Sequence, residues 1–220
     1  MTTCQKVGMI MKSLKKFLLI LAVLILAFVY AYGIWPRAIY DTDIGSNAYE
    51  VSMPLAKDMV LEQSFQCKDE GFCGIRLKLT KQMNQQIGTY QWTVTEQSSG
   101  EKVGEGIIND ASTANKDFNS QNLQKQGFIE LQFPRQKDSA GRVYTFVIQA
   151  QDVPEDESMA IYVTDKGEVE STLILAGEEL KKAGVIRLQY RRFNTETFLV
   201  FLGIMAYLAV FIRFMYRLFR

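Results

Sequence analysis

The chain has 220 residues, of which 48% are hydrophobic, with 25 basic and 24 acidic side chains. A balance this close to neutral lacks the basic excess that nucleic-acid-binding proteins gather on one face. Histidine is absent from the whole sequence, which removes the usual general base near neutral pH and the commonest metal ligand. The composition therefore predicts no nucleic acid among the partners and excludes histidine-dependent chemistry.

The first predicted element is a transmembrane helix over residues 17–35, an apolar run without a charge. As a helix, this run is long enough to cross a hydrocarbon core of about 30 Å. Four lysines precede it and only Arg37 follows closely, so the positive-inside rule makes residues 1–16 a cytoplasmic tail. Pro36 is expected to end the helix. A cleaved signal peptide is the alternative, because residues 29–31 (VYA) resemble a cleavage site.

A second transmembrane helix is predicted over residues 197–216. Its uncharged part ends at residue 212, and the helix extends further if the Arg213 side chain reaches the interface. Residues 217–220 then form a second cytoplasmic tail. A buried amphipathic helix is the alternative, but this run is apolar on every face. The expected protein is a multi-pass protein of the cell membrane with two spans and both termini in the cytoplasm.

Residues 41–192 are predicted to be an extracytoplasmic, all-β domain. Short runs with period-two alternation, such as residues 75–80 and 90–95, recur at intervals of about 10 to 15 residues. Only residues 178–183 look locally helical, and residues 109–126 read as a long polar loop. This spacing favours an antiparallel β-sandwich, with a jelly roll preferred over an immunoglobulin-like fold. The expected core residues are Ile75, Leu77, Trp92, Ile129, Leu131, Phe146 and Ile148.

Three segments of this domain carry a resemblance to a known class of module. They are residues 61–65 (LEQSF), 74–77 (GIRL) and 141–146 (GRVYTF). They resemble the β-sandwich modules of bacterial cell-surface polysaccharide machinery, which lie between spans of glycosyltransferase-type membrane proteins and are similar to carbohydrate-binding jelly rolls. The resemblance covers about two-thirds of the domain, and no glycosyltransferase domain accompanies it. It implies a non-enzymatic accessory subunit of cell-envelope polysaccharide assembly, with a glycan or an integral-membrane protein as partner.

Two cysteines of the middle domain, Cys67 and Cys73, lie close together in the sequence. Outside the cytoplasm a disulfide between them is chemically permitted, and the short loop favours it. Two free thiols are the alternative. A zinc site is not favoured, because two cysteines without a histidine make a poor ligand set.

Acidic residues gather in three places, at residues 41 and 43, at residues 152–157, and at residues 168 and 170. A carboxylate pair could hydrolyse glycosidic bonds, and residues 151–156 form the best candidate turn for calcium. Each cluster also reads as a solvated loop, which is the favoured interpretation. We therefore expect no catalytic residue, metal or cofactor, and we keep a small glycan-acting envelope enzyme as the alternative function.

Aromatic side chains are the remaining candidates, since sugars stack on exposed rings. Tyr90, Trp92 and Tyr144 follow the inward phase of their strands and are expected in the core. Phe128 is out of phase with Ile129 and the residues that follow it, so it is predicted to be exposed and to contribute to a ligand-binding surface.

Overall fold

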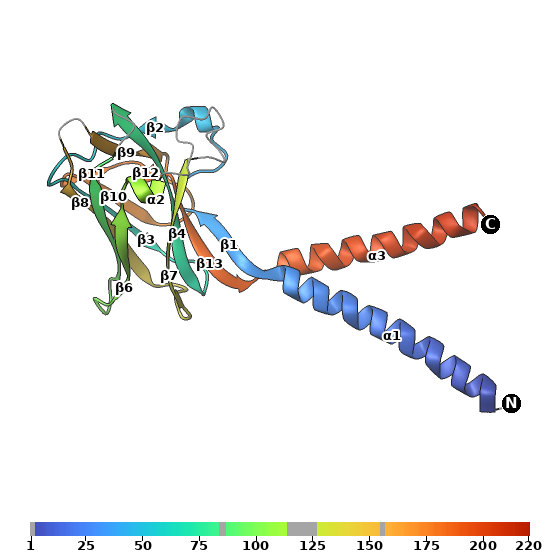
Figure 1. Cartoon of the computed structure of the whole chain (residues 1–220). Coiled ribbons are helices and arrows are strands. Elements are labelled where there is room, and N and C mark those ends of the chain that lie inside the picture. Colours follow the sequence, from blue (N-terminus) through green and yellow to red (C-terminus); the bar gives the residue numbers. More distant parts are fainter. Residues whose placement is uncertain (1–2, 84–86, 114–126, 155–156) are drawn as a thin grey trace. The chain divides into compact units, whose positions relative to one another are not determined.

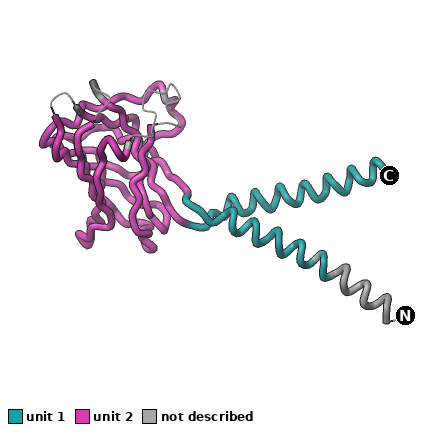
Figure 2. The backbone as a smooth tube through the Cα atoms, in the orientation of Figure 1, with its two compact units in different colours: residues 1–34, 192–220 teal, residues 35–191 magenta. Residues whose placement is uncertain are grey.

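A computed structural model of the chain describes residues 3–83, 87–113, 127–154 and 157–220. The chain forms two compact units, which Figure 2 distinguishes by colour. One unit, here called the helical unit, contains the residues up to Ile34 and those from Arg192 onward. The other, the β unit, contains Trp35–Arg191. We describe each unit by itself.

The helical unit consists chiefly of helices α1 (Thr3–Ala31) and α3 (Thr195–Leu218). With a mean hydropathy of 2.3, α3 is long and apolar enough to cross a membrane. The apolar part of α1, Phe17–Ala31, is shorter than a full span. The helix expected over residues 17–35 thus ends at Ala31, and Pro36 lies inside strand β1 (Tyr32–Ala38). Pro36 was expected to end the helix, but it restricts only Trp35 directly before it, and the helix has already ended at Ala31.

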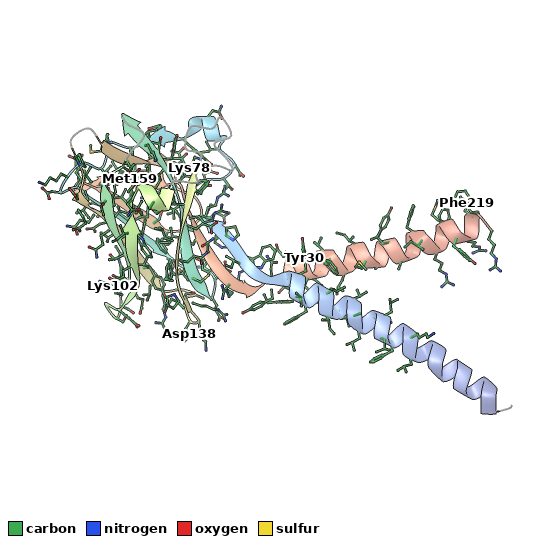
Figure 3. All side chains as sticks on the ribbon, viewed as in Figure 1. Tyr30, Lys78, Lys102, Asp138, Met159 and Phe219 are labelled. Carbon is green, nitrogen blue, oxygen red and sulfur yellow. The ribbon has the colours of Figure 1, made fainter. Side chains whose placement is uncertain are left out.

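The start of α3 is fixed by a side-chain cap. The Asn194 side chain accepts a hydrogen bond of 3.0 Å from the backbone N–H of Thr197, one of the groups that a helix leaves unpaired at its start. The backbone N–H of Asn194 also donates to the Ala31 carbonyl at 2.9 Å. Nearby, the rings of Phe28 and Phe193 stack with their centroids 5.2 Å apart. Tyr30 in α1 and Phe219 just after α3 are among the side chains that Figure 3 draws in this unit.

The β unit is built from two antiparallel sheets, as expected for the middle of the chain (Figure 1). The seven-stranded sheet consists of β1, β13 (Ile186–Phe193), β4 (Phe72–Met83), β9 (Glu157–Thr164), β12 (Ala183–Gly184), β2 (Glu50–Val51) and β7 (Phe128–Gln136). The six-stranded sheet runs in the order β11 (Glu178–Leu180), β10 (Ser171–Leu175), β3 (Val60–Gln66), β8 (Val143–Asp152), β5 (Thr89–Glu96) and β6 (Lys102–Ile108). A 3-10 turn, η1 (Ser46–Ala48), and a short helix, α2 (Asp110–Thr113), lie between strands.

The alternating sequence pattern produces this two-layer arrangement. Along β3, every second side chain is buried, since successive residues of a strand point to opposite faces. Inward-facing residues of both sheets form one core, to which all seven residues expected there belong. Tyr90 and Tyr144 are buried with them, as their phase predicted.

One predicted element is wrong. Residues 178–183, expected to be locally helical, form strand β11 and then enter β12. Leu175 pairs with Glu178 across a two-residue turn in which Ala176 and Gly177 both have positive φ, at 50° and 83°. Two positive φ values in a two-residue loop belong to a type I′ hairpin turn, which matches the twist of paired strands. Alanine is unusual in the first position of such a turn, so this hairpin was hard to predict from the sequence.

Strand pairing is nested around the hairpin of β5 and β6. Those two strands pair in the six-stranded sheet, β4 pairs with β7 in the seven-stranded sheet, and β3 pairs with β8 back in the six-stranded sheet. Each successive pair of this long hairpin therefore lies in the opposite layer. The arrangement leaves β6 at the end of its sheet and β7 paired on one side with β4.

Candidate functional site

A pocket of the β unit lies beside the end of β1, and we call it the β1 pocket. It has a volume of about 570 Å³. Its lining comes from three parts of the chain: residues 37, 38 and 40–43, Lys68 in the loop between β3 and β4, and residues 166–169 between β9 and β10. Three basic and three acidic side chains line it: Arg37, Lys68, Lys166, Asp41, Asp43 and Glu168.

Backbone contacts hold the two long walls of this pocket together. Tyr40 forms an antiparallel β-bridge with Lys166, and the N–H of Asp41 donates to the Asp165 carbonyl at 3.0 Å. Gly167 donates to the Ile39 carbonyl at 3.1 Å. A Cβ atom on Gly167 would lie 2.6 Å from the Tyr40 carbonyl oxygen, so the approach of the two segments requires a glycine here. The pocket is therefore fixed by main chain rather than by side-chain rotamers.

The charged side chains of the β1 pocket are positioned by specific contacts. Arg37 Nε donates to Asp69 Oδ2 at 2.8 Å, and this bond is the main reason that the pKa of Arg37 is raised. Asp41 Oδ1 accepts a hydrogen bond of 2.9 Å from the backbone N–H of Asp43, which holds the Asp41 carboxylate in place. Lys68 and Lys166 are exposed at the rim. Such a site can make charged and neutral hydrogen bonds to a polar ligand.

Part of this site was visible in the sequence and part was not. Asp41, Asp43 and Glu168 belong to two separate acidic clusters, and the fold brings them to one pocket. Asp152, of the remaining cluster, is exposed, whereas residues 155 and 156 of the candidate calcium turn lie outside the described residues. Within the described ranges, no three His, Cys, Asp or Glu side chains come together as a metal site. Sequence reasoning missed Arg37, Lys68 and Lys166, for which no local pattern exists.

A second pocket, the edge groove, is lined by residues of β5, β6, β7 and α2, of which β6 and β7 contact each other. Its volume is about 300 Å³, and Trp92, Ile107, Leu131 and Gln132 contribute to its lining. Trp92 pairs across the sheet with Gly106, and a Cβ on that glycine would lie 2.8 Å from the indole Nε1. The glycines of the G-x-G sequence at 104 and 106 thus make room for aromatic rings. The pairing of a glycine with a tryptophan on neighbouring strands is the sequence pattern that could have predicted this packing.

Phe128, predicted to be an exposed ligand-binding residue, is 4% exposed, so that prediction is wrong on exposure. Its phase was interpreted correctly, because Phe128 pairs with Lys78 in β4, whose neighbours Leu77 and Leu79 are core residues. Three cationic side chains cover the ring instead of solvent: Arg187, Lys78 and Arg76 lie 4.9, 5.1 and 5.5 Å from its centroid. Long basic side chains can cover an apolar ring in this way.

The expected disulfide is not present, since Cys67 and Cys73 are both buried, free thiols. The two thiols lie in different surroundings. Cys67 packs in the core and faces the Tyr190 hydroxyl. Cys73 lies in β4 at a register shift between Phe72 and Gly74, and it contacts the backbone of Arg191 instead. Burial raises the pKa of Cys67 to about 12 and also raises that of Cys73.

The fold and the pockets define a β-rich, sandwich-like protein with an apolar helix long enough to cross a membrane. No protein-family model matches the chain, and no curated protein matches it. Its function therefore has to be inferred from its own residues.

Proposed function

We propose that this chain is a non-enzymatic, membrane-anchored accessory subunit of cell-envelope polysaccharide assembly, and that it binds glycan in the β1 pocket. The observation that carries the proposal is the pocket's composition. Carboxylates and cations from three chain segments meet in one open, main-chain-braced hollow. Carboxylates accept hydrogen bonds from sugar hydroxyl groups, and arginine and lysine donate to ring oxygens, carboxylates or phosphates.

The proposed subunit crosses the membrane twice, with both termini in the cytoplasm and the β unit outside. The hydropathy of α3 supports one crossing. Support for the other comes from the uncharged sequence after Lys16 and from the lysines before it. A chain anchored at both ends keeps its β unit close to the bilayer, where lipid-linked glycans and membrane enzymes are found. An integral-membrane protein is therefore the second proposed partner.

We further propose that the β unit is a jelly roll. The nested pairs β3–β8, β4–β7 and β5–β6 support this, because they fall alternately in the two sheets. A long hairpin rolled over itself produces this alternation.

Binding is favoured over catalysis because of the groups that line the pocket. Thr42 offers a hydroxyl group, but the sequence contains no histidine to activate it. Asp41 is the pocket carboxylate whose position is fixed by a hydrogen bond, which it accepts from the backbone N–H of Asp43. These groups suit recognition of a polar ligand, which needs complementary hydrogen bonds rather than a tuned acid and base.

The test uses the full-length protein in lipid nanodiscs and oligosaccharides released from the envelope of the cells that make it. Calorimetric titration should show binding that Asp43→Asn and Lys166→Gln each weaken by about tenfold, the effect of losing one charge-assisted hydrogen bond. Asp138→Asn and Lys181→Gln change the same charges at exposed positions outside the pocket and should bind normally.

Two results would contradict the proposal. Equal affinity in the pocket and control variants would move the binding site elsewhere. Shortened or modified oligosaccharides after prolonged incubation would favour the enzyme that uses a carboxylate pair.

A further inference from the structure

The outer face of the seven-stranded sheet carries a cluster of basic side chains, here called the Phe128 cluster. Its members are Arg76 and Lys78 of β4, Arg187 of β13, and Phe128 of β7. Arg76 and Lys78 alternate with the core residues Ile75, Leu77 and Leu79, so they leave β4 on the face away from the core. In Figure 3, Lys78 is labelled within the β unit.

Strand register places these positive charges directly beside one another. Arg187 is the cross-strand partner of Arg76, and like charges in opposing positions destabilise a sheet. Lys78 lies two residues further along β4, and Arg187 contributes to lowering its pKa, after burial. All three cations contact the same ring, that of Phe128, within 5.5 Å. The mutual repulsion of these three positive charges therefore destabilises the sheet.

The described contacts of the two guanidinium groups use little of their donor capacity. Arg76 Nε lies 3.2 Å from Glu130 Oε1, and Arg187 Nε donates to the Tyr40 hydroxyl at 2.9 Å. A guanidinium has five N–H donors in a fork that fits a carboxylate or phosphate. The ion pair of Arg76 with Glu130 occupies one edge of that fork. The Arg76 side chain remains 29% exposed, so a ligand from solvent can reach it.

We propose that Arg76 and Arg187 bind an oxyanion, a carboxylate or a phosphate group, on the outer face of the seven-stranded sheet. Lys78 and Phe128 form the base of this site. The lysine adds positive charge, and the ring holds the three cations together through their attraction to its π face. An anion bound between the two guanidinium groups offsets their mutual repulsion. The site goes beyond the proposed glycan pocket, although Tyr40 connects the two, since Tyr40 also lines the β1 pocket.

Both acidic sugars and phosphorylated glycans could supply such a group, and the probes separate the two sources. Thermal unfolding of the full-length protein in nanodiscs is measured with sodium glucuronate, inorganic phosphate or methyl glucoside, at constant ionic strength. We expect glucuronate or phosphate, but not the neutral glucoside, to raise the unfolding temperature of the β unit in a saturable way. The more effective anion identifies the preferred source.

The variants Arg76→Gln and Arg187→Gln should each weaken the apparent affinity for that anion by at least about tenfold, as expected for a lost charge-assisted hydrogen bond. Arg142→Gln is the matched control, because it removes an arginine that pairs with Glu96 near the six-stranded sheet, and it should leave the response unchanged. Arg187→Lys keeps the charge but loses the fork, so it should bind with intermediate affinity.

The proposal is overturned if neither anion shifts the unfolding temperature, or if the Arg76 and Arg187 variants respond like the control. An anion-free unfolding temperature that falls sharply in both variants, without any anion response in the native protein, would show a purely structural cluster. The two sites can be tested independently. If the Arg76 and Arg187 variants lose the anion response but bind oligosaccharide normally in the β1 pocket, the anion site is distinct from the proposed glycan site. If the β1-pocket variants lose oligosaccharide binding but keep the anion response, the same conclusion holds.

Discussion

Gln63 of β3 connects the two sheets through the core, because its Oε1 accepts a hydrogen bond of 3.0 Å from the backbone N–H of Gly184 in β12. The same side chain donates from Nε2 to the Thr172 carbonyl at 3.0 Å. Gln63 is fully buried, so these bonds replace the water that its amide loses on folding.

Replacing Gln63 with leucine should therefore destabilise the β unit by about 1–3 kcal/mol, because the buried N–H of Gly184 is left without an acceptor. Denaturant unfolding in mild detergent, followed by tryptophan fluorescence, measures the change. Gln66→Leu is the control on the same strand, since its amide bonds to the Gly141 carbonyl at the surface. Equal effects of the two substitutions would contradict the argument.

Gly167→Ala should both destabilise the β unit and weaken glycan binding in the β1 pocket. The new methyl group would lie 2.6 Å from the Tyr40 carbonyl, so the two segments that form the pocket must separate. We expect a loss of about 1–3 kcal/mol, similar to other overpacked sites. Gly100→Ala is the control. No atom lies within 4 Å of a Cβ added there, so this variant has only the conformational cost of a positive φ. Calorimetric titration should show weaker glycan binding for Gly167→Ala than for Gly100→Ala. Normal glycan binding by Gly167→Ala would refute the requirement for glycine.

Lys78 should make the stability of the β unit depend on pH in the alkaline range. Burial, and secondly the charge of Arg187, lowers the pKa of Lys78 from 10.5 to about 8. Between these values the unfolded chain binds more protons than the folded one, so stability rises with pH across that window. Urea unfolding from pH 7.5 to 10 should show this rise in the native protein and a smaller one in Lys78→Met. The exposed Lys102, altered in the same way, serves as control, and identical pH profiles for all three would be inconsistent with the lowered pKa.

Cys67 and Cys73 should remain unlinked in the mature protein and react slowly while it is folded. The thiolate is the reactive form, and burial raises the pKa of both thiols, that of Cys67 to about 12. We expect little alkylation at pH 8 in the native state and complete alkylation of both residues in denaturant without reductant. Peptide mapping by mass spectrometry gives the result, and a Cys67–Cys73 linked peptide would disprove it.

In a Cys4→Ser background the two remaining thiols, Cys67 and Cys73, are buried, which allows a direct test of the proposed topology. Cysteine introduced at the exposed Ser99 should react with a membrane-impermeant maleimide in intact cells. A cysteine added after Arg220 should react only after the cells are opened. Labelling of this second cysteine in intact cells would contradict two crossings with cytoplasmic termini.

The sequence alone determined the features that depend on local periodicity. The uncharged run within α3 and the alternating residues of β3, β4, β5 and β8 are properties of neighbouring residues, so the membrane-length helix and the core could be predicted. Alternation also gave the correct face for Phe128. Alternation could not predict how exposed the Phe128 ring is, because that depends on which side chains of other strands cover the ring.

Tertiary structure decided everything that requires partners far apart in the chain. Arg76, Phe128 and Arg187 meet only through the register of β4, β7 and β13. The β1 pocket exists because residues 40 and 166 pair, which no spacing in the sequence shows. Cys67 and Cys73 are close in sequence and still have different partners, the Tyr190 hydroxyl for Cys67 and the Arg191 backbone for Cys73. Local chemistry fixes which residues can face the core or solvent, and long-range pairing fixes what they face there.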